Sequence, residues 1–285
     1  MNFYNQINEL CSIKETIKNS NMFLQKKLGQ NFIYDLNITN KIAQESKCKK
    51  KNVIEIGPGV GSLTRSLFLN GAKHIFAIEK DINSINALSE LQSIAKTKLN
   101  LIHDDAKNVK LHSLYSSPFT VVGNLPYNIA TFLIISWIKE INYYQSTNNL
   151  LLERIVILVQ EEVAKKLSAR VGEKLYGRLS VLINLFCDCE IKINLKPNCF
   201  FPVPKVNSSL IEIIPLNKMR YKVNLDLFEK ITKVSFSQRR KMLRQSLKNI
   251  QGERIIKSSK IDGTLRPENL TTKNFCDLAN SLSEI

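Results

Sequence analysis

The sequence contains no apolar stretch long enough to cross a membrane. Its longest candidate, Ile129 to Ile138, falls well short of the roughly 20 residues that a bilayer-spanning helix needs. We therefore exclude an integral membrane protein and expect no membrane partner. Hydrophobic residues make up 44% of the chain, which is typical of a soluble globular protein.

The six cysteines do not have the paired C-x-x-C spacing of a zinc site, and we expect no metal. A disulfide framework is also not expected, because such frameworks belong mainly to small secreted domains. The first 21 residues have neither the apolar core of a signal peptide nor the arginines of a transit peptide. These features predict a cytoplasmic protein with reduced cysteines.

Acidic residues are few, with 25 Asp and Glu against 41 Lys and Arg and a net charge of +16. The excess indicates a polyanionic partner, although an A+T-rich genome that favours lysine codons would also produce it. Residues 218–260 concentrate the charge, with thirteen basic and three acidic residues. Their segment 237–244 predicts a helix that contacts phosphates through Arg239, Arg240, Lys241 and Arg244.

A chain of 285 residues has room for one larger α/β domain and a small second domain. β-branched runs alternate with helical patterns up to residue 215, a linker-like stretch follows, and only helical spacing comes after it. We predict an N-terminal extension (1–21), an α/β domain (22–215) and an all-α basic domain (216–285). Helical spacing in the extension predicts a surface helix or a frayed arm.

The predicted α/β domain is organised around residues 52–64. β-branched residues at the start of this stretch predict a short buried strand, and Ser62 to Leu69 predicts a helix. The turn between them holds Gly57, Gly59 and Gly61. Because glycine has no Cβ, this turn can take positive φ, and a ligand can approach its backbone and the N–H groups of the helix. A nucleotide-like ligand is implied.

Two common nucleotide-binding signatures are missing. Ser62 stands where the dinucleotide fingerprint needs its third glycine, and the Gly-Lys-Ser/Thr of a Walker loop is absent. A second predicted strand, Ile75 to Ile78, ends in Glu79, which lies 22 positions after Gly57. A carboxylate at the tip of this strand suits hydrogen bonds from both ribose hydroxyls of an adenosine moiety.

A third predicted strand, Leu99 to His103, is followed directly by Asp104 and Asp105. Ligands of open α/β sheets lie beyond the carboxyl ends of the strands, so a carboxylate here can accept a hydrogen bond from an exocyclic adenine amine. Capping of a following helix is the competing interpretation, and one of the two aspartates could serve it instead.

A fourth predicted strand, Phe119 to Val122, runs into Gly123 and then Asn124-Leu125-Pro126-Tyr127. The Asn124 side-chain oxygen and the Leu125 carbonyl can each accept a proton of an exocyclic amine. Pro126 fixes the backbone that aims these groups, and Tyr127 can stack on a planar base. This run predicts a site for a base that bears an amine.

Two further loops supply candidates. Gln30 and Asn31 place donors and acceptors where a loop can close over a ligand, although an ordinary basic loop would have the same composition. Phe200 opens a loop stiffened by two prolines. It could form the second face of a base sandwich with Tyr127, or it could belong to the core.

Together these residues resemble the ribosomal RNA adenine N6-dimethyltransferase family, and most closely its bacterial small-subunit type. The resemblance runs from Lys27 to the end of the chain. The segments that carry it are 27–32, 55–59, 124–127, 176–180, 200–208 and 236–241. It implies an α/β fold, a Rossmann-like S-adenosylmethionine-dependent methyltransferase domain with a small all-α C-terminal domain.

The family resemblance implies S-adenosylmethionine as cofactor. It implies as substrate two adjacent adenosines in the 3′-terminal hairpin loop of small-subunit (16S) rRNA, each methylated twice at N6, within a 30S-type particle during subunit biogenesis. By matching position, the cofactor-binding residues are Asn31, Ile33, Gly57, Gly59, Glu79, Asp105 and Asn124. The catalytic group is Asn124, Leu125, Pro126, Tyr127 and Phe200. Asp105 is preferred to Asp104 because it directly precedes an alanine.

Two alternatives remain open. A large-subunit rRNA adenine N6-methyltransferase of the macrolide-resistance type would share the glycine loop, but segments 176–180 and 236–240 favour the small-subunit type. A non-catalytic rRNA-binding assembly factor on the same fold is the other, and the intact Glu79, Asp105 and 124–127 argue against it. No exposed apolar stripe is evident in the sequence, so we expect a monomer.

Overall fold

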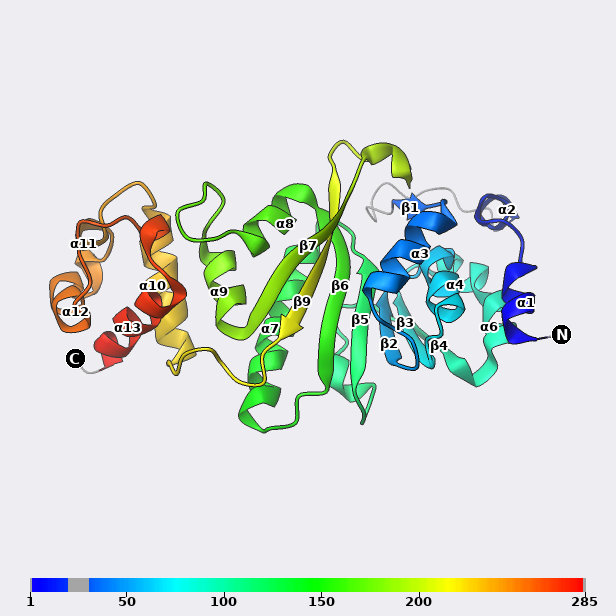
Figure 1. The fold of residues 1–285 in the computed structure, drawn as a ribbon, viewed down its shortest axis with the longest axis horizontal. Coiled ribbons are helices and arrows are strands. Elements are labelled where there is room, and N and C mark those ends of the chain that lie inside the picture. Colours follow the sequence, from blue (N-terminus) through cyan, green and yellow to red (C-terminus); the bar gives the residue numbers. More distant parts are fainter. Residues whose placement is uncertain (1, 20–30, 284–285) are drawn as a thin grey trace. The chain divides into compact units, whose positions relative to one another are not determined.

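The computed structural model describes residues 2–19 and 31–283, and the chain forms two compact units (Figure 1). The first contains Met1–Ala164 and Glu190–Pro215, and the second contains Lys165–Cys189 and Leu216–Ile285. The boundary predicted after residue 215 coincides with the start of Leu216–Ile285, whereas Lys165–Cys189, which the prediction places in the α/β domain, belongs to the second unit. This segment joins the second unit because its helix packs against two C-terminal helices there.

The first unit is built on a mainly parallel sheet. Its seven strands, in spatial order, are β4 (Leu99–His103), β3 (His74–Glu79), β2 (Asn52–Ile56), β5 (Phe119–Asn124), β6 (Leu152–Gln160), β9 (Ser208–Pro215) and β7 (Cys187–Leu195). The neighbours from β4 to β6 run parallel, whereas β9 is antiparallel to β6. This arrangement confirms the predicted Rossmann-like α/β class.

The register of the central strands brings their carboxyl ends to one edge. Ile56 of β2 lies opposite Ile78 of β3 and Gly123 of β5, and Glu79 lies opposite His103 of β4. These strands are rich in β-branched residues and largely buried, as expected for parallel strands covered on both faces. Residues that follow the strands therefore meet at a single edge of the sheet.

Helices connect the strands of the first unit. They are α3 (Leu36–Glu45), α4 (Ser62–Leu69), α5 (Ile82–Ala87), α6 (Ser89–Ala95) and α7 (Ala130–Ser146). α3 and α4 pack side by side (Figure 1). The helical segment between β3 and β4 is divided at Leu88, which ends α5 and precedes α6. α8 (Glu161–Ser168) begins in the first unit and ends in the second.

The N-terminal extension is packed rather than frayed. It forms α1 (Phe3–Asn8) and α2 (Ile13–Asn19). Ile7 and Ile13 are 2% and 3% exposed, and the ring of Phe3 meets that of Phe68 edge-on. Of the two expected alternatives, the structure has helices rather than a frayed arm, and their apolar face is buried in the core of the first unit.

A second, two-stranded sheet pairs β1 (Phe32–Ile33) with β8 (Phe200–Phe201). The strands are antiparallel, with Ile33 opposite Phe200 and Phe32 opposite Phe201. The loop with two prolines that was predicted around Phe200 thus begins as a strand. It pairs with β1, at the end of the resemblance segment 27–32.

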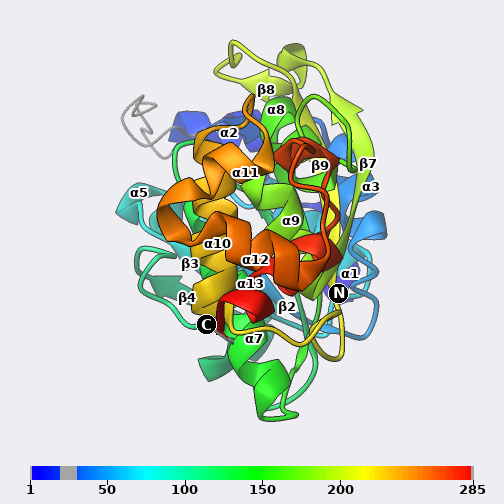
Figure 2. The same cartoon turned by 90° about the vertical axis from the view of Figure 1, so that its left-hand side faces the viewer.

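Apart from the start of β7 at positions 187–189, the described residues of the second unit form helices and connecting segments. Its helices are α9 (Arg178–Phe186), α10 (Leu225–Ser237), α11 (Leu243–Ser246), α12 (Gly252–Ser259) and α13 (Thr272–Ser283). α13 packs against both α10 and α12 (Figure 2). Tyr176 fixes the start of the α9 segment, because its hydroxyl donates to the Leu270 carbonyl at 2.8 Å.

The helix predicted over Ser237 to Arg244 does not form. α10 ends at Ser237, the cations at positions 239–241 lie in a turn before α11, and Arg244 lies within α11. The backbone N–H of Leu243 donates to the Leu265 carbonyl at 2.8 Å instead of to its own helix. Tertiary hydrogen bonds therefore replace the helical ones here. None of the helices in residues 2–19 and 31–283 is long and apolar enough to span a membrane.

Candidate active site

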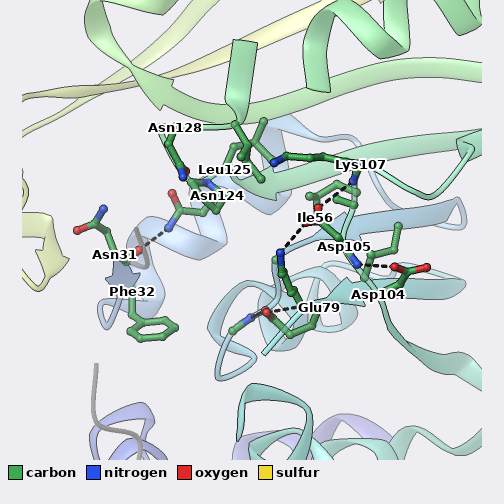
Figure 3. A pocket seen from close by; sticks show the side chains of 17 residues that line it. Asn31, Phe32, Ile56, Glu79, Asp104, Asp105, Lys107, Asn124, Leu125 and Asn128 are labelled. Atoms are coloured by element: carbon green, nitrogen blue, oxygen red, sulfur yellow. Dashed lines mark hydrogen bonds and ion pairs between the residues drawn. The ribbon is translucent and has the colours of Figure 1, made fainter. Parts of the chain in front are cut away.

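A pocket of about 200 Å³ lies at the carboxyl edge of β2, β3, β4 and β5 (Figure 3). All of its lining residues belong to the first unit. Those predicted from the sequence are Asn31, Gly57, Gly59, Glu79, Asp104, Asp105, Asn124, Leu125 and Pro126. The remainder are Phe32, Ile56, Ile78, Lys80, Ala106, Lys107, Asn128 and Ile129.

The glycine turn after β2 has the predicted backbone conformation. Gly57 and Gly59 have φ values of +68° and +56°, in the left-handed region that side chains disfavour. A Cβ on Gly59 would lie 2.6 Å from a ring carbon of Phe32. Glycine is therefore required on two grounds, and the bare backbone of the turn faces the pocket.

Glu79 holds the glycine turn in place. Its Oε2 accepts the Gly59 N–H at 3.1 Å, and its Oε1 accepts the N–H groups of Lys80 and Asp81 at 2.9 Å each. Burial raises the pKa of this carboxyl, and the three N–H groups oppose that shift. A carboxylate has about four acceptor positions, so about one remains for a ligand hydroxyl. If Glu79 accepts hydrogen bonds from both ribose hydroxyls, as predicted, the two hydroxyls must share this one acceptor position.

Asp104 and Asp105 both line the pocket, and neither caps an α-helix. Asp105 accepts the Lys80 ammonium on Oδ2 at 2.7 Å and the Lys107 N–H on Oδ1 at 3.1 Å. The hydrogen bond from Lys80 is the main cause that lowers its pKa. Asp104 accepts the Asp105 N–H and the Asn108 amide. The helix-capping interpretation therefore does not apply, because the two aspartates accept hydrogen bonds from the turn after β4 and from Lys80.

Asn124 is fixed by the N-terminal segment. Its Nδ2 donates to the Asn31 carbonyl at 2.6 Å (Figure 3), while its Oδ1 accepts no hydrogen bond from the described residues. The Leu125 N–H donates to the Leu158 carbonyl of β6 at 3.2 Å. Both anchors hold the run after β5 rigidly, with the side-chain oxygen of Asn124 available to an amine.

Three expected site residues do not line this pocket. Ile33 is 3% exposed and belongs to the main core, and Phe200 is likewise 3% exposed in the same cluster. Phe200 is therefore a core residue, and its position does not support a role in stacking on a base. Its neighbour Phe201 is exposed and stacks on Tyr34. Tyr127 is half-buried, and its hydroxyl lies 2.6 Å from that of Ser208.

Glu55, from the resemblance segment 55–59, is the one fully buried carboxyl beneath the turn among the described residues. It is 0% exposed, and neither oxygen has a hydrogen-bond partner there. Burial raises its pKa to about 8, and the charge of Glu79 adds to the shift. The Thr64 hydroxyl opposes the shift although it does not reach hydrogen-bond geometry. Glu55 is therefore a neutral acid at pH 7.

Several pocket residues were missed by the sequence reasoning. Lys80 directly follows Glu79, and Lys107 lies two residues after Asp105, so their positions after β3 and β4 were the available signal. Asn128 continues the run 124–127 by one residue. Phe32 belongs to a motif whose first part, including Gln30, lies outside the described residues, and its ring position follows only from the tertiary fold.

The basic residues predicted to bind phosphate lie in the second unit. Arg239 is already engaged, because its Nε donates to Glu268 at 2.8 Å and an Nη donates to the Glu173 carbonyl at 3.3 Å. Arg240, Lys241 and Arg244 are exposed. Three of the four cations therefore present their charge to solvent. No group of three or more potential metal ligands occurs among the described residues.

The parallel sheet, the glycine turn after its first parallel strand and the acids after the next two define a Rossmann-like S-adenosylmethionine-dependent methyltransferase. The chain matches the model of the family described as "Ribosomal RNA adenine dimethylase" over residues 21–284. It therefore belongs to that family. The enzyme class and cofactor predicted from the sequence agree with this membership.

Relatives and solved structures are similar over most of the chain. "Ribosomal RNA small subunit methyltransferase A" of Wolbachia sp. subsp. Drosophila simulans is 41% identical, over 90% of this chain and 93% of that protein. The protein of the same name from Wolbachia pipientis wMel is 38% identical over 99% and 97%. A dimethyladenosine transferase structure from Plasmodium falciparum has a TM-score of 0.72 at 24% identity, covering 89% and 98%.

The structure of the 23S rRNA methyltransferase ErmE is also similar, with a TM-score of 0.68 at 23% identity, covering 89% of this chain and 100% of that one. At these identities the two structures establish the fold. A large-subunit enzyme and a dimethyladenosine transferase therefore share one architecture, and the fold by itself does not separate their substrates.

Proposed function

We propose that this protein transfers methyl groups from S-adenosylmethionine to N6 of two adjacent adenosines in the 3′-terminal hairpin loop of small-subunit rRNA. The observation that carries the proposal is the meeting of Asn124, Leu125 and Pro126 with the acids of β3 and β4 in one pocket. The small-subunit substrate is supported by the names of relatives that match nearly the full chain.

The chemistry of the pocket residues fits the proposed cofactor. Glu79 would accept a ribose hydroxyl, and Asp105 would accept the adenine amine. Asn31 and Asn124 supply polar groups at the opposite end, and the bare backbone of Gly57 and Gly59 allows close approach. S-adenosylmethionine supplies an electrophilic methyl group when bound.

The protein's task in the transfer is alignment. In the first transfer, the Oδ1 of Asn124 and the Leu125 carbonyl each accept one hydrogen of the target amine, which directs the nitrogen lone pair towards the methyl group. In the second transfer the monomethylated amine has one hydrogen left, so only one of the two acceptors is used. The amine nitrogen becomes cationic as the new bond forms and releases its proton afterwards, so no strong general base is needed. Tyr127, tethered to Ser208, would hold the base.

The target adenosine must leave its stack to enter the pocket, which favours a loop over continuous duplex. Arg240, Lys241 and Arg244 of the second unit would hold the surrounding phosphates. We propose that the enzyme acts in the cytoplasm as a monomer on a 30S-type particle during small-subunit assembly.

Methyl transfer from labelled S-adenosylmethionine to small subunits that lack the modification tests this proposal. Large subunits and naked rRNA serve as parallel substrates. We expect N6,N6-dimethyladenosine on small-subunit rRNA alone. Label on large-subunit rRNA would place the protein with the resistance type, and cofactor binding with no transfer to any substrate would make it a binding protein.

A further inference from the structure

Phe132 is an unusually exposed aromatic side chain near the pocket. It lies in the first turn of α7 and is 56% exposed, whereas the next two residues, Leu133 and Ile134, are fully buried. Single exposed apolar residues are common on protein surfaces, so exposure alone implies nothing. The position of this ring relative to the pocket is what sets it apart.

Phe132 stands at the rim of the active-site pocket. Ile129, which lines the pocket, lies one helical turn before it, and residues three apart on a helix share a face. The Leu133 N–H donates to the Ile129 carbonyl at 3.0 Å, which shows that this turn is helical. A second pocket residue, Lys107, places its ammonium 5.9 Å from the centre of the Phe132 ring.

Lys107 is a cation without a carboxylate partner among the described residues. Its neighbour Asp105 forms its ion pair with Lys80, whereas Lys107 donates its backbone N–H to Asp105 and its charge is a minor cause of the lowered pKa of that carboxyl. In Figure 3 its side chain runs from beside Asp105 towards Leu125. The contact with the Phe132 ring is at the outer limit of cation–π reach, about 6 Å, so a phosphate could take the ammonium at small cost.

An exposed ring beside an ammonium that forms no ion pair with the described residues has the chemistry of a nucleotide subsite. Aromatic side chains stack on bases without regard to sequence, and lysines neutralise phosphates. A target base that leaves its stack also removes a stacking partner from the adjoining base. A ring at the pocket rim can replace that partner.

We propose that Phe132 and Lys107 form a subsite for the nucleotide next to the adenosine being methylated. The Phe132 ring stacks on the neighbouring base, and the Lys107 ammonium contacts its phosphate. The inference rests on the proposed rRNA substrate and adds a positioning role for two residues outside the catalytic run 124–127.

The test compares Phe132→Ala with Tyr143→Ala. Tyr143 is the matched control, because it lies on the same helix three turns later and is 60% exposed. We expect Phe132→Ala to raise KM for the rRNA about tenfold, since stacking on an aromatic is worth about 1–3 kcal/mol per base and 1.4 kcal/mol is a factor of ten. kcat at saturating RNA and the Kd for S-adenosylmethionine stay unchanged, and Phe132→Trp restores KM.

Lys107→Gln is measured beside Lys110→Gln, an exposed lysine three residues further on. Only Lys107→Gln is expected to lower the salt dependence of rRNA binding, by about one phosphate contact. The inference is overturned if Phe132→Ala and Tyr143→Ala have the same KM as the wild type, or if Phe132→Ala weakens cofactor binding as much as RNA binding. A wild type that methylates no rRNA would overturn both the proposed function and the subsite.

Discussion

Glu55 combines complete burial with two oxygens that have no hydrogen-bond partner among the described residues. Its pKa of about 8 means that the folded chain keeps this proton where an unfolded chain, with an ordinary pKa of 4.5, has lost it. Between these two values the folded state binds one more proton than the unfolded state. The free energy of unfolding therefore falls as the pH rises through this window.

The substitution Glu55→Gln tests this linkage. The amide is neutral at every pH, so the contribution of Glu55, about 1.4 kcal/mol per pH unit between pH 4.5 and 8, is removed from the slope. Urea unfolding at a series of pH values should show the variant gaining stability relative to the wild type as the pH rises, with no such gain below pH 4.5. Parallel curves for the two proteins would contradict the assignment.

Asn124 carries the catalytic proposal at the same scale. Asn124→Ala removes the acceptor of the target amine and the bond to the Asn31 carbonyl. Loss of one such hydrogen bond costs about 1 kcal/mol of stability, so the fold should survive. We expect kcat to fall about a hundredfold or more, the order seen when one preorganised polar group is removed from an active site. A variant that retained wild-type kcat would exclude Asn124 from catalysis.

At the scale of elements, helix α2 of the N-terminal extension supports the glycine turn beside the pocket. Ile13 of α2 packs with Phe32 and with Val60 of the glycine turn. The Arg65 side chain of α4, 6% exposed, donates to the Cys11 carbonyl at 2.6 Å and to the Thr16 hydroxyl at 3.3 Å. The extension is thus fixed to the helix that begins at the glycine turn.

Ile13→Ala should therefore weaken both stability and cofactor binding. Truncating a buried isoleucine costs about 2–5 kcal/mol, and here the lost packing also supports Val60 and Phe32 beside the pocket. Lys14→Ala, exposed on the same helix, is the control and should change neither quantity. Urea unfolding and calorimetry with S-adenosylmethionine measure the two effects. Unchanged cofactor affinity in Ile13→Ala would limit the extension to a stabilising role.

The parallel strands β2 to β5 could be predicted because each is a short, largely apolar run followed by turn residues, and their order then brings Gly57, Glu79 and Asp105 to one edge. The sequence could not distinguish Phe200 from Phe201. Neighbouring strand residues face opposite sides, and only the pairing of β8 with β1 decides which ring is buried. Likewise the packing of Ile13 and the pairing of Arg239 with Glu268 depend on partners far away in the chain.

At the scale of the whole molecule, the pocket and the most basic segment belong to different units. The pocket is lined entirely by the first unit, and the most basic segment, residues 218–260, belongs to the second. With a net charge of +16, non-specific attraction to RNA will act over the whole surface. Contacts made by particular cations must therefore be separated from this background by their salt dependence.

Arg239 and Arg240 allow a specific phosphate contact to be distinguished from this background attraction. The two arginines are adjacent in sequence, but only Arg239 forms an ion pair with a described residue. Arg239 is paired with Glu268, whereas Arg240 is exposed. We expect Arg240→Ala to weaken binding to small-subunit rRNA and to reduce the slope of log K against log salt by about 0.7 to 0.9, the value for one lost phosphate contact. Arg239→Ala should leave the slope unchanged, because its charge is already neutralised. Equal slopes in Arg240→Ala and the wild type would move the phosphate contacts away from this turn, and a reduced slope in Arg239→Ala would mean that rRNA displaces Glu268.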